Sequence, residues 1–350
     1  MFRVLIVDDS PVVREILQEW LASEKDIEVV GEAENGGSAV DLVKKLSPDL
    51  VIMDILMPGI DGLEATEIIM ADHPTPILIF SSVANDQEAN IAFEAISRGA
   101  LDVMAKPDSV RQNHQSIKEE LIKKIRILSR IPVIRHPRGR ITARARKQEM
   151  KIISPLQVRY EVLGIGASTG GPRALHEILQ HFPKNFPSPI LVVQHIAKAF
   201  IEGLVNWINK DSELSVKIAK QGEKLKPATV YLAPPDLHLL VRNDRIHLKD
   251  TPPVNNCRPS VDVLFQSLAE SYGERAVAVL LTGMGNDGAV GMKEIYERGG
   301  KTIAQDQETS LVFGMPASAI EMSVVDKVLP LGRIPEEILN AFSLLKKGGR

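Results

Sequence analysis

The stretch Gly164-Ile165-Gly166-Ala167-Ser168-Thr169-Gly170-Gly171-Pro172 follows a short apolar run and precedes an amphipathic pattern, which predicts a strand-to-helix turn. A dinucleotide fingerprint would need glycine where Thr169 stands. A P-loop beginning at Gly166 would need lysine where Pro172 stands. The pattern G-x-S-x-G fits, with Ser168 at its centre, and is typical of turns that expose a nucleophilic hydroxyl. A glycine turn with a purely structural role remains an alternative.

Around this turn, residues 153–350 alternate short apolar runs with helical patterns. This predicts a doubly wound, mostly parallel α/β domain, in which ligands bind at the carboxyl ends of the strands. The runs 237–241 and 245–248, joined through Asn243-Asp244, predict a β-hairpin inserted into that pattern. The other predicted strands are 161–164, 190–193, 229–232, 276–281 and 301–304.

A serine nucleophile needs a base, and histidine is the usual one. His195 differs from the other histidines because it follows strand 190–193, at the edge where sites assemble. Asp287 lies in the glycine-rich loop after strand 276–281 and is the candidate acid that orients the imidazole, although an N-cap role is equally open. The amides of Thr169 and Met284 are candidate oxyanion donors. Together these residues predict acyl transfer by a Ser-His-Asp triad.

The first half of the chain carries a different set of strand ends. Five βα units over residues 1–125 predict a flavodoxin-like (βα)5 domain, with strands at 4–7, 27–30, 50–53, 77–80 and 102–104. Asp8 and Asp9 follow the first strand and Asp54 follows the third, so three carboxylates are expected to share one pocket and to bind Mg²⁺. Ser81 ends the fourth strand and Lys106 follows the fifth. These groups suit transfer of a phosphoryl group to an aspartate.

Residues 126–152 break both patterns and predict an interdomain linker, extended by proline and by charge repulsion. A solvated linker and an arm that binds phosphate or acidic groups are both open interpretations. The basic residues are Arg135, Arg138, Arg140, Arg144, Arg146, Lys147 and Lys151.

Composition limits the class of protein. The 350 residues carry 42 Lys+Arg and 45 Asp+Glu, a net charge of −3, which argues against a protein that coats nucleic acid. The single cysteine, Cys257, excludes a disulfide framework and a cysteine-rich zinc site. No apolar run is long enough to span a membrane, and the N-terminus does not resemble a secretory signal. We therefore expect a cytoplasmic protein of two domains that inserts into no membrane.

The motifs of both halves resemble known families. Asp8-Asp9, Asp54 and Lys106, with Met57-Pro58-Gly59, resemble the response-regulator receiver family. That resemblance implies Asp54 as the phospho-acceptor and Ser81 and Lys106 as switch residues. The second half resembles the chemotaxis protein-glutamate methylesterase (CheB) family in these segments: Gly166–Gly171, Gln194-His195, Arg258–Asp262, Leu281–Gly288 and Phe313–Pro316.

The second resemblance implies hydrolysis of γ-glutamyl methyl esters on chemoreceptors, deamidation of receptor glutamines, and a chemotaxis histidine kinase as phosphodonor. It implies no cofactor for the ester chemistry, and Arg258 could bind acidic receptor surface or form an ordinary salt bridge. A DNA-binding response regulator would need a helix-turn-helix in place of the second α/β pattern. A nucleotide-dependent oxidoreductase is disfavoured by Thr169.

Overall fold

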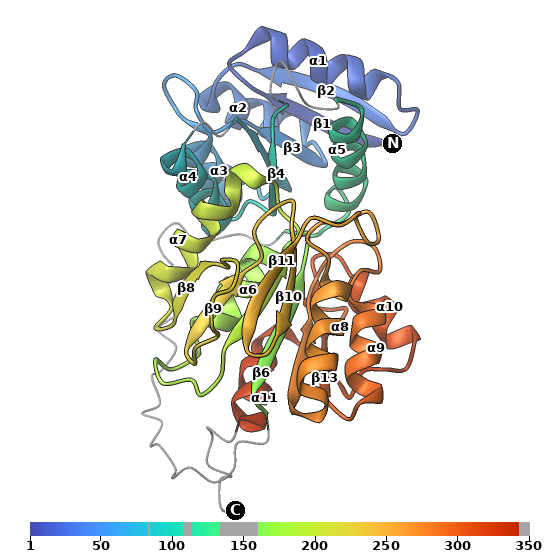
Figure 1. The fold of residues 1–350 in the computed structure, drawn as a ribbon. Helices are drawn as coiled ribbons and strands as arrows, with labels where there is room; N and C mark the ends of the chain where they lie inside the picture. Colours follow the sequence, from blue (N-terminus) through green and yellow to red (C-terminus); the bar gives the residue numbers. More distant parts are fainter. Residues whose placement is uncertain (83–84, 108–113, 134–159, 343–350) are drawn as a thin grey trace, which may run out of the picture. The chain divides into compact units, whose positions relative to one another are not determined.

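The computed structural model describes residues 1–82, 85–107, 114–133 and 160–342. The chain forms two compact units, residues 1–143 and 144–350. Most of the predicted linker, from residue 134 onward, lies outside the described residues (Figure 1). In the described part, no helix combines the length and the apolar character needed to cross a membrane.

The first unit is built on a five-stranded parallel sheet in the order β2-β1-β3-β4-β5. The order in which successive strands are added reverses between β1 and β3, which is where a doubly wound sheet opens a crevice at its carboxyl edge. The strands are β1 (Phe2–Val7), β2 (Ile27–Ala33), β3 (Leu50–Met53), β4 (Ile77–Ser81) and β5 (Asp102–Ala105). The helices are α1 (Pro11–Ala22), α2 (Gly36–Leu46), α3 (Gly62–Asp72), α4 (Asp86–Ser97) and α5 (His114–Leu128).

Local sequence explains where these helices begin. The side chains of Ser10, Asn35, Asp61 and Asn85 each accept a hydrogen bond from the first turn of the helix that follows. Such caps satisfy amides that have no partner inside the helix. Helices α1, α2 and α4 begin three to five residues after the preceding strand ends, so their caps keep these strand-end loops short, whereas α3 begins nine residues after β3 ends.

The second unit contains a seven-stranded sheet in the order β14-β13-β12-β6-β7-β9-β8, and every pairing in it is parallel. The strands are β6 (Val162–Ala167), β7 (Ile190–Gln194), β8 (Ser215–Ile218), β9 (Thr229–Leu232), β12 (Ala276–Leu280), β13 (Lys301–Gln305) and β14 (Lys327–Leu329). The helices are α6 (Gly171–Leu179), α7 (Ile201–Asp211), α8 (Val261–Tyr272), α9 (Ala289–Glu297), α10 (Met315–Glu321) and α11 (Ile334–Ala341).

The predicted hairpin forms, but as a separate two-stranded sheet of β10 (His238–Arg242) and β11 (Arg245–Lys249). Asn243 and Asp244 both have positive φ angles, 50° and 54°, as a two-residue type I′ turn requires. The hairpin packs on α8 (Figure 1). There the hydroxyl of Ser267 accepts a hydrogen bond from the amide of Val241 at 3.1 Å.

Two groups of helices cover the seven-stranded sheet. Helices α8, α9 and α10 contact one another in sequence, and α6 contacts both α7 and α11. The three central strands, β12, β6 and β7, are buried along their whole length, as strands covered on both faces should be. The core therefore holds the carboxyl ends of these three strands in fixed positions.

Candidate functional site

The candidate catalytic residues follow three adjacent strands of the second unit. Ser168 follows β6, His195 follows β7, and Asp287 lies in the loop after β12. Strand β6 pairs with both of the others, and the order in which strands are added to the sheet switches sides between β6 and β12. The three loops therefore meet at the point of the sheet where ligands are expected.

The turn that carries Ser168 is tied to both of its neighbours. The amide of Ser168 donates to the carbonyl of Thr282 at 3.0 Å, and the amide of Gly171 donates to the carbonyl of Ser168 at 2.7 Å. The side-chain amide of Gln194 donates to the carbonyls of both Ser168, at 2.8 Å, and His195, at 2.9 Å. This buried side chain thus fixes the serine turn relative to the histidine.

The side chains of His195 and Asp287 form a hydrogen-bonded pair at the edge of the sheet. Nε2 of His195 lies 2.9 Å from Oδ2 of Asp287, and Nδ1 lies 3.8 Å from Sγ of Cys257. Because Asp287 engages Nε2, Nδ1 is the nitrogen left to act as a base. Within the described residues, Ser168 Oγ makes no hydrogen bond to the ring. Catalytic hydrogen bonds are often loose without substrate and tighten in the complex.

Asp287 is 2% exposed and does not cap the helix that follows it. Instead its carboxylate binds the N-terminus of α8. Oδ1 accepts from the hydroxyl of Ser260 at 2.7 Å and Oδ2 from the amide of Val261 at 2.7 Å. The amide of Asp262 and the side chain of Asn255 complete the set, at 3.1 and 3.3 Å from Oδ1. Sequence reasoning did not find these partners, although Ser260 in front of an apolar run is a recognisable N-cap.

These contacts set the charges of the pair. Burial opposes ionisation of Asp287, but its hydrogen bonds, led by the one from His195, keep its pKa below the ordinary value. Burial also disfavours protonated His195. The hydrogen bond to Asp287, followed by the adjacent Cys257 sulfur, outweighs this and raises the pKa of His195 to about 9. The free imidazole is therefore a stronger base than an isolated histidine.

The loop after β12 lies directly against the serine turn. A Cβ added to Gly283 would lie 2.7 Å from Cβ of Ser168, so glycine is needed for this close approach. The hydroxyl of Thr282 donates to the carbonyl of Thr169 at 2.9 Å, which joins the two loops. Thr169 and Met284, the candidate oxyanion donors, therefore belong to two loops in contact.

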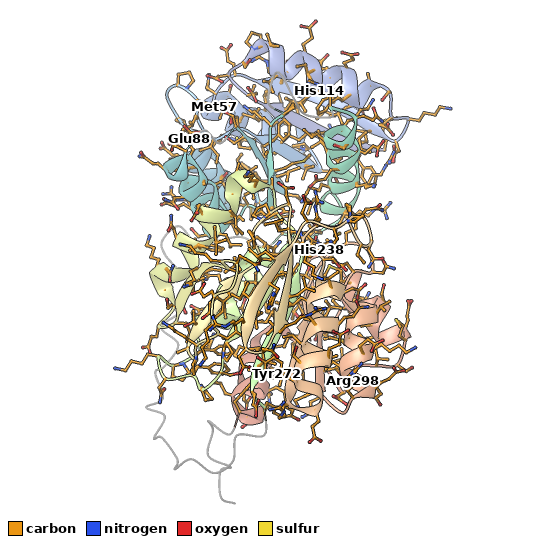
Figure 2. All side chains as sticks on the ribbon, viewed as in Figure 1. Met57, Glu88, His114, His238, Tyr272 and Arg298 are labelled. Atoms are coloured by element: carbon orange, nitrogen blue, oxygen red, sulfur yellow. The ribbon has the colours of Figure 1, made fainter. Side chains whose placement is uncertain are left out.

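Near this site, His238 at the start of β10 is buried and supports the α8 terminus (Figure 2). Its Nδ1 accepts a hydrogen bond from the amide of Ser260 at 3.2 Å. Arg258 pairs with the carboxylate of Asp250 and donates to the carbonyl of Thr251 at 3.1 Å. Of the two open interpretations of Arg258, these contacts support the salt bridge.

The first unit gathers its predicted polar residues at the carboxyl edge of its own sheet. Nζ of Lys106 lies 2.7 Å from Oδ2 of Asp8 and 2.9 Å from Oδ2 of Asp54. The hydroxyl of Ser81 donates to Oδ1 of Asp54 at 2.9 Å. Asp8, Asp9 and Asp54 each offer a carboxylate oxygen within 4.8 Å of the others.

This carboxylate cluster has the chemistry of a hard cation site. Asp8 and Asp54 are buried and Asp9 is exposed, so the cluster is reachable from solvent. Burial raises the pKa of Asp8, and neighbouring Asp54 adds to the effect, while Lys106 opposes it. A divalent cation with oxygen ligands would relieve this repulsion, so the residues fit Mg²⁺.

Both halves of the chain match known protein families. Residues 163–338 match the family model of the CheB methylesterase, and residues 4–118 match that of the response regulator receiver domain. A protein-glutamate methylesterase/protein-glutamine glutaminase of Anaeromyxobacter dehalogenans is 44% identical, over 96% of each chain. One of Thermotoga maritima is 40% identical, over 97% of this chain and 98% of its own. The crystal structure of the Thermotoga maritima CheB methylesterase catalytic domain matches with a TM-score of 0.50 and 44% identity, over 53% of this chain and 99% of that chain.

Proposed function

Because the chain belongs to the CheB family of methylesterases and carries a receiver domain ahead of the catalytic domain, we propose that it removes methyl groups from γ-glutamyl methyl esters of chemoreceptors and releases methanol. We further propose that the same site deamidates receptor glutamines. The observation that carries the proposal is the 2.9 Å His195–Asp287 pair, which lies at the same sheet edge as the Ser168 turn.

The proposed chemistry is acyl transfer in two stages. Nδ1 of His195 accepts the proton of Ser168 Oγ as that oxygen attacks the ester carbonyl, and Asp287 stabilises the imidazolium that forms. The imidazolium then gives its proton to the departing methoxide, so methanol leaves and an acyl-serine remains. Water, deprotonated by the same nitrogen, releases the glutamate. With a glutamine substrate the leaving group is ammonia, and the other steps are unchanged.

Two backbone amides are proposed to stabilise the tetrahedral anion. Thr169 follows the nucleophile, and Met284 follows Gly283, which packs on Ser168. Donors from two joined loops can hold an oxyanion between them without moving during the reaction. Losing one such donor typically raises a barrier by about 3 kcal/mol.

The receiver domain is proposed to control the esterase through phosphorylation of Asp54 by a chemotaxis histidine kinase. Asp8, Asp9 and Asp54 would hold Mg²⁺, which neutralises charge on the transferring phosphoryl group when bound. Lys106 contacts the Asp54 carboxylate and would pair with a phosphoryl oxygen. Ser81 donates to the same carboxylate and would be released to meet the new phosphate.

Methanol release from methylated receptor membranes tests the esterase proposal. Ser168→Ala should lower kcat roughly 10⁴-fold or more, because the nucleophile is lost. Ser212→Ala, at the end of α7, removes a hydroxyl bonded to the carbonyl of Leu179 and serves as the matched control. Methanol release that survives in Ser168→Ala would refute the assignment of the nucleophile.

A further inference from the structure

A thiol lies beside the free nitrogen of His195. Sγ of Cys257 lies 3.8 Å from Nδ1, and the proposed mechanism gives it no role. His195, Cys257 and Asp287 each offer a ligand atom within 4.8 Å of the others. This is a mixed nitrogen, sulfur and oxygen cluster outside the carboxylate site of the receiver domain.

We propose that His195 Nδ1 and Cys257 Sγ bind a thiophilic divalent cation, Zn²⁺ by preference, and that this cation inhibits the esterase. A single cysteine excludes a cysteine-rich zinc site but not a mixed site of this kind. The binding claim stands on these side chains, whereas the inhibition rests on the proposed function.

The distance between the two donor atoms suits zinc. Bonds of about 2.0 Å to nitrogen and 2.3 Å to sulfur, at a tetrahedral angle, separate the two donors by about 3.5 Å. The observed 3.8 Å therefore needs only a small side-chain movement. Two protein ligands leave the remaining positions to water, which is the arrangement of a reversible inhibitory ion and not of a structural one.

The surroundings of His195 favour metal binding through Nδ1. Oδ2 of Asp287 lies 2.9 Å from Nε2, so in the neutral imidazole the proton is held on Nε2 and the lone pair is on Nδ1; a cation displaces the second proton from Nδ1 when it binds. A carboxylate bonded to the far nitrogen of a ligating histidine is the usual partner arrangement around zinc. Asp287 is in turn fixed by Ser260 and by the α8 terminus, so the imidazole is oriented before any ion arrives.

A rigid turn presents the thiol. Val254 and Cys257 exchange two backbone hydrogen bonds, of 3.1 and 2.8 Å, around Asn255 and Asn256. Both asparagines have positive φ angles, 52° and 60°, which identifies a type I′ turn, and asparagine tolerates that conformation well. Cys257 is partly exposed and the side chain of His195 is 16% exposed, so an ion can reach them from solvent.

The cation is expected to inhibit the esterase because it occupies the lone pair of His195 Nδ1. The proposed base is Nδ1, and a cation bonded to it leaves no acceptor for the Ser168 proton. Carboxylate-rich sites select Mg²⁺, whereas thiolate and imidazole select zinc and its neighbours in the first transition series. The receiver cluster and the His195–Cys257 pair should therefore bind different ions.

Cobalt(II) binding to the full-length protein tests the site without relying on activity. Because Cys257 is the only cysteine, a thiolate-to-cobalt charge-transfer band can arise from no other residue. The band should appear in the wild type and equally in Ser168→Ala, and Zn²⁺ should abolish it. Cys257→Ser and Cys257→Ala should lack it, and His195→Ala should weaken cobalt binding at least tenfold. Absence of the band in folded wild-type protein would overturn the site.

The proposed inhibition of the esterase is tested by measuring methanol release in the presence of zinc. The zinc concentration that halves each variant's own rate should be at least tenfold higher for Cys257→Ser than for the wild type. Mg²⁺ at the same concentrations should not inhibit. Equal zinc sensitivity in the wild type and Cys257→Ser would refute inhibition through this site, whatever the cobalt spectra show. A protein without esterase activity would refute the proposed function, and the cobalt spectra would still decide the metal site.

Discussion

The Asp287 carboxylate accepts hydrogen bonds from an imidazole, a hydroxyl and the first amides of a helix. A helix N-terminus carries partial positive charge, so the negative charge of Asp287 is stabilised by the fold itself. Its partner His195 gains a higher pKa from the same arrangement. The strength of the base therefore depends on Asp287 and on the groups that hold its carboxylate.

The raised pKa of His195 predicts the pH dependence of the esterase. His195 must be neutral to accept a proton, so kcat/KM should be low below its pKa and rise through it. With a pKa of about 9, the rise in metal-free enzyme should lie well above the ordinary value of 6.5. Asp287→Asn removes the main contact that raises this pKa and should move the midpoint down toward 6.5, with a large loss of rate.

The measurement is a pH–rate profile of methanol release by chelator-treated protein. The profile of Ser212→Ala should match that of the wild type. A wild-type midpoint at or below 6.5, or a midpoint that Asp287→Asn leaves in place, would contradict the assigned role of the pair.

Ser260 is predicted to position Asp287. Ser260→Ala leaves one oxygen of the buried Asp287 carboxylate without its hydroxyl donor, which should cost about 1–3 kcal/mol of hydrogen-bonding free energy. Because Asp287 is then held less precisely, kcat should fall roughly tenfold with little change in KM. Ser271→Ala is the matched control, since Ser271 lies on the helix that Ser260 caps and its hydroxyl donates to the carbonyl of Val241 in β10 at 2.9 Å. The activity of both variants and the pH midpoint of Ser260→Ala are measured. Equal effects of the two variants would contradict a positioning role.

Sequence reasoning reached some of these residues and missed others for a physical reason. Ser168, His195 and Asp287 were chosen because they follow strands, and parallel strands bring their carboxyl ends to one edge. Cys257 and Ser260 lie in the segment between the hairpin and α8, which follows no strand of the parallel sheet. Only tertiary folding brings that segment to His195 and Asp287.

At the scale of elements, β6 and α8 pack with little space between them. A Cβ added to Gly164 would lie 2.6 Å from Cδ1 of Leu268 and 3.1 Å from Cε1 of Phe265. Gly164→Ala should therefore destabilise the second unit by about 1–3 kcal/mol through overpacking. Gly332→Ala meets only Glu177 Oε1, at 3.9 Å, and should be nearly neutral.

Urea unfolding measures this difference. Trp207 lies in α7 and Trp20 in α1, so Trp20→Phe leaves one fluorophore that reports on the second unit. The midpoint should fall for Gly164→Ala and stay in place for Gly332→Ala. If Gly164→Ala unfolds at the wild-type midpoint, α8 must shift without cost, and the close packing of β6 on α8 would not contribute to stability.

The burial of each strand explains whether its position could be predicted from the sequence. The central strands β6, β7 and β12 are buried throughout and appear in the sequence as continuous apolar runs. The edge strands β8 and β14 were not predicted, because each is paired on one side and partly exposed, so their sequences carry no such run. Burial on both faces is what makes a strand of this fold visible in its sequence.

In the whole molecule, phosphorylation of the first unit is proposed to control ester hydrolysis by the second. Substitution of Asp54 tests this coupling. A small phosphodonor with Mg²⁺ should raise methanol release by the full-length protein. Asp54→Asn should reduce the ratio of stimulated to basal activity to one, because it removes the proposed phospho-acceptor. Asp41→Asn removes the same charge from an exposed position on α2 and should keep the stimulation. Chelation of Mg²⁺ should mimic Asp54→Asn. If Asp54→Asn is stimulated as strongly as Asp41→Asn, control of the esterase does not pass through the carboxylate cluster that Lys106 and Ser81 contact.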